Sequence, residues 1–273
     1  MGPRRRRQLG AAAVGLAVAV GAAAPARADD DDERTLLHAS LILAGGLAYA
    51  TSETVLKDDL APDRCRWCDD NALDRGVRDA VVWRRTGLAA RTSDVLGFAI
   101  TPALELSLVV VAGRRDGPAR AWLADSLAVV ESAIAAGLAN QTTKFLVGRA
   151  RPYAWADPGS PAAADPDANL SFYSGHTTLG FSLAASAGTV AQLRGYRWAP
   201  WIWGAGVALA ATTGYLRMAA DRHWLTDVVT GAVIGTGIGI AVPRLAHPHL
   251  GPRGGVGVEV VIGPGQVGVA GVF

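Results

Sequence analysis

The stretch SGHTTLGFSLAASAGTVAQL, residues 174–193, joins a helix start to a long run of small and apolar residues. Ser174 is a favoured residue just before a first helical turn, and Gly175 lets other groups approach the backbone closely. The first N–H groups of a helix have no partner inside it, and such an end binds anions well. We therefore expect a helix over 176–193 whose N-terminus, with His176, can face a phosphate-like group.

Six apolar segments of this kind predict an all-α bundle of six helices. They lie at 36–50, 95–113, 123–147, 176–193, 199–216 and 224–242. Hydrophobic residues make up 50% of the 273 residues, and the mean hydropathy is +0.23. Many small residues, together with tryptophans near segment ends, favour a membrane-embedded bundle, although a soluble periplasmic bundle stays open.

Two cations stand near the end of the third segment, where Lys144 is followed after six residues by Arg151 and Pro152. Seven residues make about two turns of a helix, so Lys144 and Arg151 fall on nearly the same face. Pro152 disfavours the helical conformation at Arg151 and therefore ends the helix. The guanidinium offers a planar fork and the ammonium a point charge, so both can hold oxygens of one phosphate.

A third cluster contains Arg217, His223 and Asp227, between the fifth and sixth segments. His223 and Asp227 have the i, i+4 spacing that places two side chains on one helical face. A carboxylate there can accept the Nδ1–H of the imidazole and leave Nε2 ready to attack phosphorus. Taken singly, each cluster is also compatible with a purely structural role, such as a surface ion pair, a helix cap or charges flanking a membrane helix. The combination favours chemistry, since the chain has only five histidines and two of them, His176 and His223, stand in these clusters.

The three clusters together resemble the signature of the type 2 phosphatidic acid phosphatase (PAP2) superfamily, which also includes bacterial non-specific acid phosphatases and vanadium haloperoxidases. The resemblance covers roughly 94–242. It implies that His223 attacks phosphorus to form a phosphohistidine, that Asp227 orients it, and that His176 protonates the leaving oxygen. It also implies a reaction without metal or cofactor and a set of phosphate-binding residues, namely Lys144, Arg151, Ser174, Gly175 and Arg217.

The resemblance leaves the substrate open. A membrane enzyme would act on a phosphorylated lipid, such as phosphatidic acid, a polyprenyl diphosphate or a glycolipid phosphate, whereas a soluble periplasmic form would act on small phosphoesters. A vanadium-dependent haloperoxidase and a non-catalytic phospholipid-binding protein also stay open, although binding alone needs no nucleophilic histidine. Tyr173 and Leu216 stand where proline and serine are usual in the family, which concerns loop shape and substrate preference. The formal net charge of +2 indicates no nucleic-acid partner.

Residues 1–28 form an export signal or an N-terminal anchor, with Arg4–Arg7 as the positive region and 10–24 as the apolar core. Arginines gather at the segment ends opposite the three clusters, so the positive-inside rule predicts an inner-membrane protein with its active site outside the cytoplasm. A cleaved signal followed by six spans would reverse that orientation. We therefore expect 36–50, which is shorter than the about 20 apolar residues of a span, to lie at the surface or to re-enter.

The rest of the chain divides into an N-terminal helix with a charged loop, a phosphatase core, and a Gly- and Val-rich tail, at 29–93, 94–243 and 244–273. Cys65 and Cys68 are the only cysteines, and such a pair in an exported protein predicts a disulfide. The tail predicts a short β-hairpin around a Gly-Pro-Gly turn. His247 and His249 precede it and are interpreted as linker residues rather than metal ligands.

Overall fold

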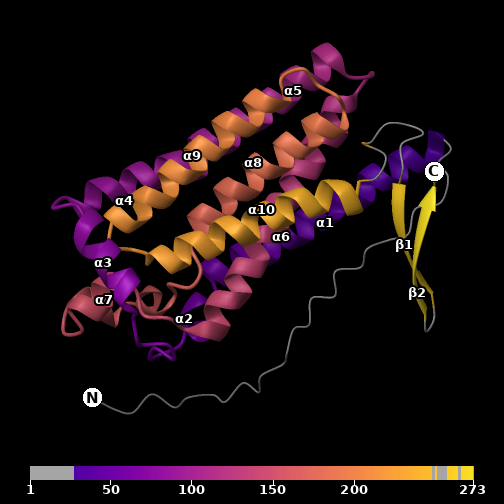
Figure 1. Ribbon diagram of the computed structural model, residues 1–273. Helices are drawn as coiled ribbons and strands as arrows, with labels where there is room; N and C mark the ends of the chain where they lie inside the picture. The colour runs from indigo at the N-terminus through magenta and orange to yellow at the C-terminus, as the bar shows by residue number, and fades with distance from the viewer. Residues whose placement is uncertain (1–27, 248–249, 251–256, 264–265, 273) are drawn as a thin grey trace.

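The computed structural model describes residues 28–247, 250, 257–263 and 266–272. Six long helical segments lie side by side in one elongated bundle, which confirms the all-α prediction (Figure 1). They are α1 (Ala28–Thr54), α4 (Thr86–Val95) continued through the π-helical turn η1 (Leu96–Ile100) into α5 (Thr101–Asp116), α6 (Ala121–Val147), α8 (Gly175–Leu193), α9 (Ala199–Ala219) and α10 (Leu225–Leu245).

Helix α8 lies at the centre of the bundle, packed against α10, α9 and α6. Most of its side chains are buried, and most of these belong to Ala, Gly, Ser or Thr. Small side chains let neighbouring backbones approach closely, and hydroxyl groups can bond to other helices. Ser182 Oγ donates to the Ser132 carbonyl of α6 at 3.1 Å in this way. The core therefore depends on close packing of small residues.

Three glycines at four-residue spacing let α10 pack directly on the backbone of α8. At Gly231, Gly235 and Gly239, an added Cβ would collide with a carbonyl oxygen of α8 or of the residue before it. This close approach brings the start of α10 beside the start of α8, where the N–H of Ser174 donates to the Asp227 carbonyl at 3.1 Å. Helix packing thus places two of the three predicted clusters next to each other.

The C-terminal ends of α1, α6 and α9 meet the N-terminal ends of α4, α8 and α10 at one end of the bundle, called the site end here (Figure 1). Gly148 stops α6 there in the left-handed conformation, with φ of 60°, which glycine adopts without strain. The short elements at this end are α2 (Lys57–Leu60), α3 (Ala72–Val81), α7 (Pro152–Ala156), η2 (Pro161–Ala164) and η3 (Pro166–Asn169). All three predicted clusters lie at this end, as expected.

The stretch predicted as a charged loop contains α2, α3 and the first part of α4. Helix α4 begins at Thr86, so the domain boundary expected after residue 93 falls inside a helix. A local signal for α3 was present, because the side chain of Asn71 caps the helix by accepting from the N–H of Asp74 at 2.9 Å. The high charge of this stretch hid the helix, since its apolar residues are few.

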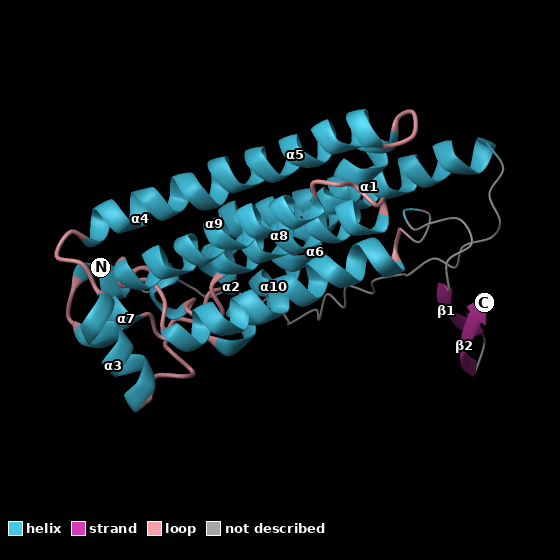
Figure 2. Cartoon of the chain, turned by 45° about the horizontal axis from the view of Figure 1, so that its top comes forward, coloured by secondary structure: helices cyan, strands magenta, loops and turns pink. Residues whose placement is uncertain are grey.

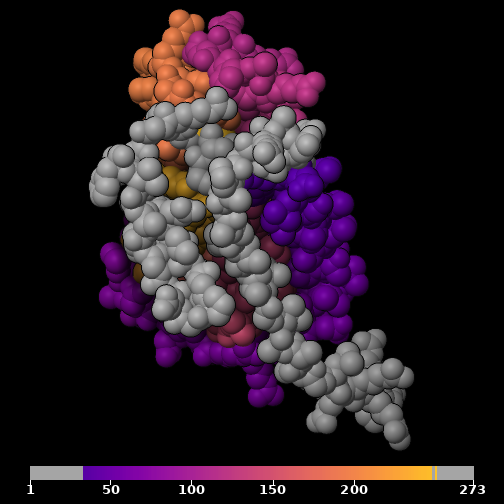
Figure 3. All heavy atoms as spheres, turned by 90° about the vertical axis from the view of Figure 1, so that its right-hand side faces the viewer, coloured from indigo at the N-terminus to yellow at the C-terminus, as the bar shows by residue number. Residues whose placement is uncertain are grey.

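Four helical segments of the described residues are long and apolar enough to cross a membrane: Glu33–Thr54, Thr86–Asp116, Ala121–Val147 and Leu225–Leu245. The first corrects the expectation that 36–50 is too short for a span, because α1 extends through polar residues on both sides and has 27 residues. Seen from the far end, opposite the site end, α1 lies at an edge of the bundle (Figure 3). Leucines on it are exposed, namely Leu36, Leu37, Leu41, Leu43 and Leu47.

Near the C-terminus, β1 (Gly257–Gly263) and β2 (Gln266–Val272) form a two-stranded antiparallel sheet (Figure 2). The register runs from Gly257 opposite Val272 to Gly263 opposite Gln266, close to the predicted hairpin. The predicted signal or anchor, apart from Ala28, lies outside the described residues.

Candidate active site

Lys144 and Gly175 come together where the end of α6 meets the start of α8. A Cβ on Gly175 would lie 3.5 Å from Lys144 Nζ and 2.9 Å from Asn140 Oδ1, so glycine keeps this approach open. Asn140, one turn before Lys144, donates to the Tyr173 carbonyl at 2.7 Å and holds the loop against α6. Within the described part of the chain, Lys144 Nζ makes no hydrogen bond or ion pair. Its ammonium and the first N–H groups of α8 are groups that could together bind an anion.

Arg217 and His176 share the carboxylate of Asp94 in α4, which sequence analysis did not single out. His176 Nε2 donates to Asp94 Oδ1 at 2.8 Å, and Arg217 Nη1 donates to the same oxygen at 3.1 Å. Arg217 also donates to Ser93 Oγ at 3.1 Å, while its buried Nε has no partner among the described residues. Arg217 lies in the last turn of α9 rather than in a loop, because the helix continues beyond its predicted end.

His223 lies in the turn before α10, and both nitrogens of its imidazole have partners. Nδ1 donates to the Ser171 carbonyl at 2.9 Å, and Arg151 Nη1 donates to Nε2 at 3.2 Å. A guanidinium can only donate, so Nε2 is the unprotonated nitrogen and Nδ1 carries the hydrogen. The tautomer is therefore the predicted one, with Nε2 unprotonated and its lone pair accepting a hydrogen bond from Arg151.

Asp227 does not accept the Nδ1–H of His223, contrary to the prediction, since its Oδ2 lies 3.6 Å from Nδ1. The i, i+4 argument holds inside a helix, whereas α10 begins at Leu225, so His223 stands before the first turn. Asp227 accepts instead from Ser171 Oγ at 2.5 Å and from the N–H of Trp224 at 3.0 Å. It fixes Ser171, whose carbonyl in turn fixes His223, and is thus a positioning residue.

The environment of His223 favours its neutral form. Burial lowers the pKa of His223 well below its usual value, and the nearby cations, Arg151 first among them, lower it further. Only 3% of the residue is exposed. A neutral imidazole with Nε2 free of hydrogen is the form that can act as a nucleophile.

Arg151 is held by partners from the chain itself. Its Nε donates to the Asp167 carbonyl at 2.8 Å, its Nη2 lies 2.7 Å from the Asp167 carboxylate, and its Nη1 donates to the Arg222 carbonyl at 2.9 Å. Lys57 Nζ also lies 3.1 Å from Asp167. Burial raises the pKa of Asp167, but the positive charges of Arg151 and the neighbouring lysines outweigh it and hold that pKa well below its usual range. Arg151, which was predicted to bind phosphate, is therefore already paired with the carboxylate of Asp167.

A second buried arginine, Arg149, connects three parts of the site. Its Nη2 donates to Asp74 Oδ2 at 2.7 Å, and its Nη1 donates to Asp227 Oδ1 at 2.5 Å and to Thr226 Oγ1 at 2.7 Å. The guanidinium also lies over the ring of Trp67, 4.2 Å from its centroid. The two carboxylates are 75 and 78 residues away in the chain, so no local pattern could reveal this network.

The Cys65–Cys68 loop packs on the end of α6. A disulfide joins its two cysteines. The N–H of Arg66 donates to the Gly148 carbonyl at 2.8 Å, and the N–H of Ala150 donates to the Trp67 carbonyl at 3.1 Å. The loop therefore satisfies a free carbonyl at the helix end and holds Trp67 against the buried guanidinium.

Ser174 occupies the predicted position before α8, but its side chain does not cap the helix. Its Oγ accepts instead from the Thr177 hydroxyl at 2.9 Å, and the residue is buried. The predicted contribution of Ser174 to an anion site therefore does not come from a capping hydroxyl. Gly175 is the member of this pair that borders Lys144.

Residues 125–249 match the sequence profile of the PAP2 superfamily. This segment contains every predicted catalytic and phosphate-binding residue, from Lys144 to Asp227, so the predicted resemblance is confirmed there. Asp74 and Asp94 lie before the matched segment.

A stretch of 127 residues, 46% of this chain, is 32% identical to the lipid A 1-phosphatase of Porphyromonas gingivalis. That match spans 24% of the relative, so the two proteins share about a quarter of its length. Among solved structures, the transmembrane PAP2 type phosphatidylglycerolphosphate phosphatase of Bacillus subtilis aligns with 75% of this chain and 93% of its own. The sequence identity there is 20% and the TM-score 0.45.

Proposed function

We propose that this chain, whose residues 125–249 belong to the PAP2 superfamily, is a membrane phosphatase that removes phosphate from a lipid phosphomonoester or diphosphate through a phosphohistidine. The observation that carries the proposal is the state of His223. Its Nδ1–H is held by the Ser171 carbonyl, and its Nε2 lone pair lies 3.2 Å from Arg151, among cations suited to a phosphoryl group.

The reaction proceeds in two displacements. In the first, Nε2 of His223 forms a bond to phosphorus, the bond from phosphorus to the ester oxygen breaks, and His176, as imidazolium, gives the proton of Nδ1 to the departing oxygen while its Nε2–H stays with Asp94. In the second, water attacks phosphorus, the P–N bond breaks, His176 takes a proton from the water, and phosphate leaves. Asp94 holds the Nε2–H of His176 at 2.8 Å and positions it for both steps.

Charge stabilisation comes from Lys144, Arg151 and Arg217, aided by the first N–H groups of α8. Lys144 has no hydrogen-bond partner within the described residues, and the buried Nε of Arg217 is likewise unpartnered there. A buried donor without a partner, as this Nε is, is unfavourable in a protein unless a ligand satisfies it. A phosphoryl group with three peripheral oxygens supplies the matching acceptors.

A lipid substrate is supported by the surface beside His176. The Phe98 ring packs against the imidazole, with ring centroids 4.3 Å apart, yet 56% of Phe98 is exposed. Val95 next to it is also exposed. An apolar flank bordering an acid–base residue suits a substrate whose phosphate is attached to hydrocarbon. The name of the Porphyromonas relative makes a glycolipid 1-phosphate the first lipid to try.

We place the active site on the outer face of the cytoplasmic membrane. Gln141 Nε2 donates to Glu53 Oε2 at 2.6 Å, so α1 runs from the far end to the site end. The placement requires that Arg4–Arg7 are retained on the cytoplasmic side and that 10–24 does not itself cross the membrane, because a crossing there followed by α1 would bring the site end to the cytoplasm. The arginines of α3 and its flanks lie at the site end, so the arginine distribution on which the prediction rested no longer separates the two ends. A cysteine introduced at Ser160 should react with an impermeant thiol reagent in intact spheroplasts; protection would reverse this orientation.

The direct test is trapping of the intermediate. Wild-type protein in detergent, mixed with phosphate-labelled lipid and quenched, should yield an acid-labile phosphoprotein, and His223→Ala should yield neither label nor turnover. Arg75→Ala, an exposed change on α3, is the matched control and should keep both. Activity should persist in EDTA and fall with vanadate, which mimics pentacovalent phosphorus. Full turnover by His223→Ala would reject the mechanism, and release from small phosphoesters alone would reject the lipid assignment.

A further inference from the structure

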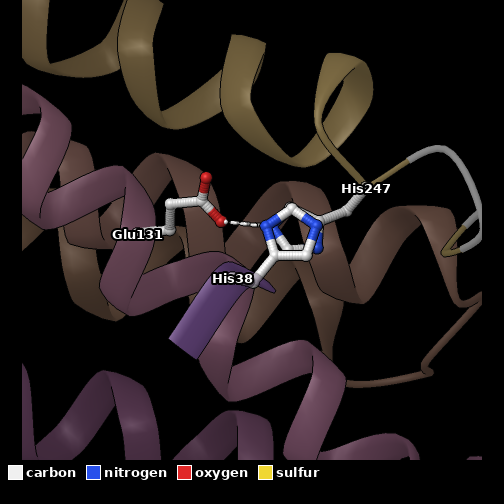
Figure 4. Close-up of side chains that lie close together, drawn as sticks. All are labelled: His38, Glu131 and His247. Atoms are coloured by element: carbon white, nitrogen blue, oxygen red, sulfur yellow. Dashed lines mark hydrogen bonds and ion pairs between the residues drawn. The ribbon is translucent and has the colours of Figure 1, made fainter. Parts of the chain in front are cut away.

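Three side chains with metal-binding atoms meet in the half of the bundle away from the active site. His38 comes from α1, Glu131 from α6, and His247 from the residues that follow α10 (Figure 4). Glu131 and Lys144 are 13 residues apart on the same helix, which is about 20 Å along its axis. The cluster is therefore separate from the phosphate site and has no part in the mechanism described above.

One carboxylate oxygen holds both imidazoles. His38 Nδ1 donates to Glu131 Oε2 at 2.7 Å, and His247 Nε2 donates to the same oxygen at 2.8 Å. The two rings are stacked, with centroids 4.1 Å apart, so both present a nitrogen on the same side (Figure 4). All three ligand atoms lie within 4.8 Å of one another.

These separations are close to those around a bound metal ion. Zinc binds histidine nitrogen and carboxylate oxygen at about 2.0–2.2 Å, which puts neighbouring ligand atoms of a tetrahedral site roughly 3.3 Å apart. The two nitrogen–oxygen distances would each have to open by about half an ångström, a change within the reach of small side-chain rotations. No movement of the helices is required.

The donor set selects the class of ion. Imidazole nitrogens suit zinc, copper, iron and nickel, whereas magnesium and calcium prefer oxygen ligands throughout. Two histidines and one glutamate leave at least one coordination position for water. We propose that His38, Glu131 and His247 bind a divalent transition-metal ion such as Zn²⁺. This revises the sequence-based interpretation of His247 as a linker residue.

The ion would join three elements, α1, α6 and the residues that follow α10, through their side chains. Helix α1 lies at an edge of the bundle, with many of its leucines exposed. His247 is buried and stands where the chain leaves α10, while the side chains of His38 and Glu131 keep 12% and 16% of their surface exposed. Bound metal would fasten both α1 and the end of α10 to α6.

The test measures metal binding on the full chain in detergent, prepared without a polyhistidine tag and stripped with a chelator. Titration with Co²⁺, followed by visible absorption and by metal analysis, should show one ion per chain, and Zn²⁺ should displace it. His38→Ala, His247→Ala and Glu131→Gln should each weaken binding by at least roughly 100-fold, more than the loss typical for changes outside the ligand set. Zn²⁺ should also raise the thermal midpoint of the wild type and not that of these variants.

Two controls make the result specific. The double change His176→Ala with His223→Ala should still bind one ion, because those histidines lie at the other end of the bundle. Ser40→Ala, an exposed change on α1, should bind as the wild type does. Circular dichroism and elution as a single species check that each variant is folded, without reference to phosphatase activity. Absence of stoichiometric binding by the wild type would overturn the proposal. The cluster would then be only a pair of hydrogen bonds from His38 and His247 to Glu131. Unchanged binding in folded His38→Ala and His247→Ala would also overturn it.

Discussion

Replacement of Arg149 by alanine should destabilise the protein far more than replacement of a surface arginine. Arg149 is 1% exposed and bonds to the carboxylates of Asp74 and Asp227, which are both fully buried. Removing one partner of a buried ion pair costs about 3–5 kcal/mol, because the remaining charge is left uncompensated. Arg75, whose side chain is 52% exposed and 3.0 Å from Asp70, is the matched control. Its replacement should cost about 0.2–1 kcal/mol.

The pH dependence of this loss identifies its cause. Burial acts to raise the pKa of Asp74, but hydrogen bonds from Thr226 and Arg149 outweigh it, so the pKa of the folded protein lies below the usual value. A lowered carboxyl pKa contributes stability that is present above the unfolded pKa, near 4, and is lost as the pH falls through the folded pKa. The difference between wild type and Arg149→Ala should therefore be largest near neutral pH and shrink in acid.

The assay is thermal unfolding in detergent, with SDS titration as a second measure of stability. Asp74→Asn introduced into the Arg149→Ala protein should recover part of the loss, because it removes one uncompensated charge. The reasoning fails if Arg149→Ala is as stable as Arg75→Ala, or if Asp74→Asn destabilises the variant further.

Three further outcomes follow from the site. The acid limb of kcat/KM should lie below about pH 6.5, because the pKa of His223 is lowered and the free enzyme keeps this imidazole neutral down to that pH. An acid limb above about pH 6.5 would contradict a buried neutral imidazole. Asp94→Asn should reduce kcat up to about 100-fold for substrates with poor leaving groups and much less for p-nitrophenyl phosphate, since Asp94 acts through His176; equal losses would show a merely structural role. Mass spectrometry of unreduced peptides should recover Cys65 linked to Cys68, and two alkylated thiols would count against the disulfide.

The sequence predicted the parts of the fold that depend on local pattern. Long runs of small and apolar residues marked each of the six helical segments. The end of the helix that carries Lys144 was misplaced, because α6 stops at Val147 with Gly148 as its cap, whereas Pro152 begins α7 and Arg151 lies outside α6. The true lengths of the segments were missed, because helices such as α1 continue into polar residues that hydropathy does not count. Helix α3 was missed because most of its residues are polar, although Asn71 is a residue type that favours the start of a helix.

The site was predictable only as far as its residues stand close together in the chain. Spacing identified His223 and Asp227, yet it gave the wrong partner for Nδ1, because a carbonyl from another loop, that of Ser171, lies nearer. Asp94 lies 82 residues from His176, and Asp167 comes from the short helix η3 between α7 and α8. Such contacts are set by helix packing, and single-sequence reasoning has no means of placing them.

The carboxylates of Asp94 and Asp167 mean that, in the proposed phosphatase, the phosphate-binding groups would be partly neutralised before any substrate arrives. Asp94 accepts from Arg217 at 3.1 Å, and Asp167 lies 2.7 Å from Arg151. An incoming phosphate therefore enters by exchange, taking over cations that already have acidic partners, and the net attraction is smaller than three bare cations would give. The same exchange runs in reverse when inorganic phosphate departs, so these two residues limit product retention as well as substrate affinity.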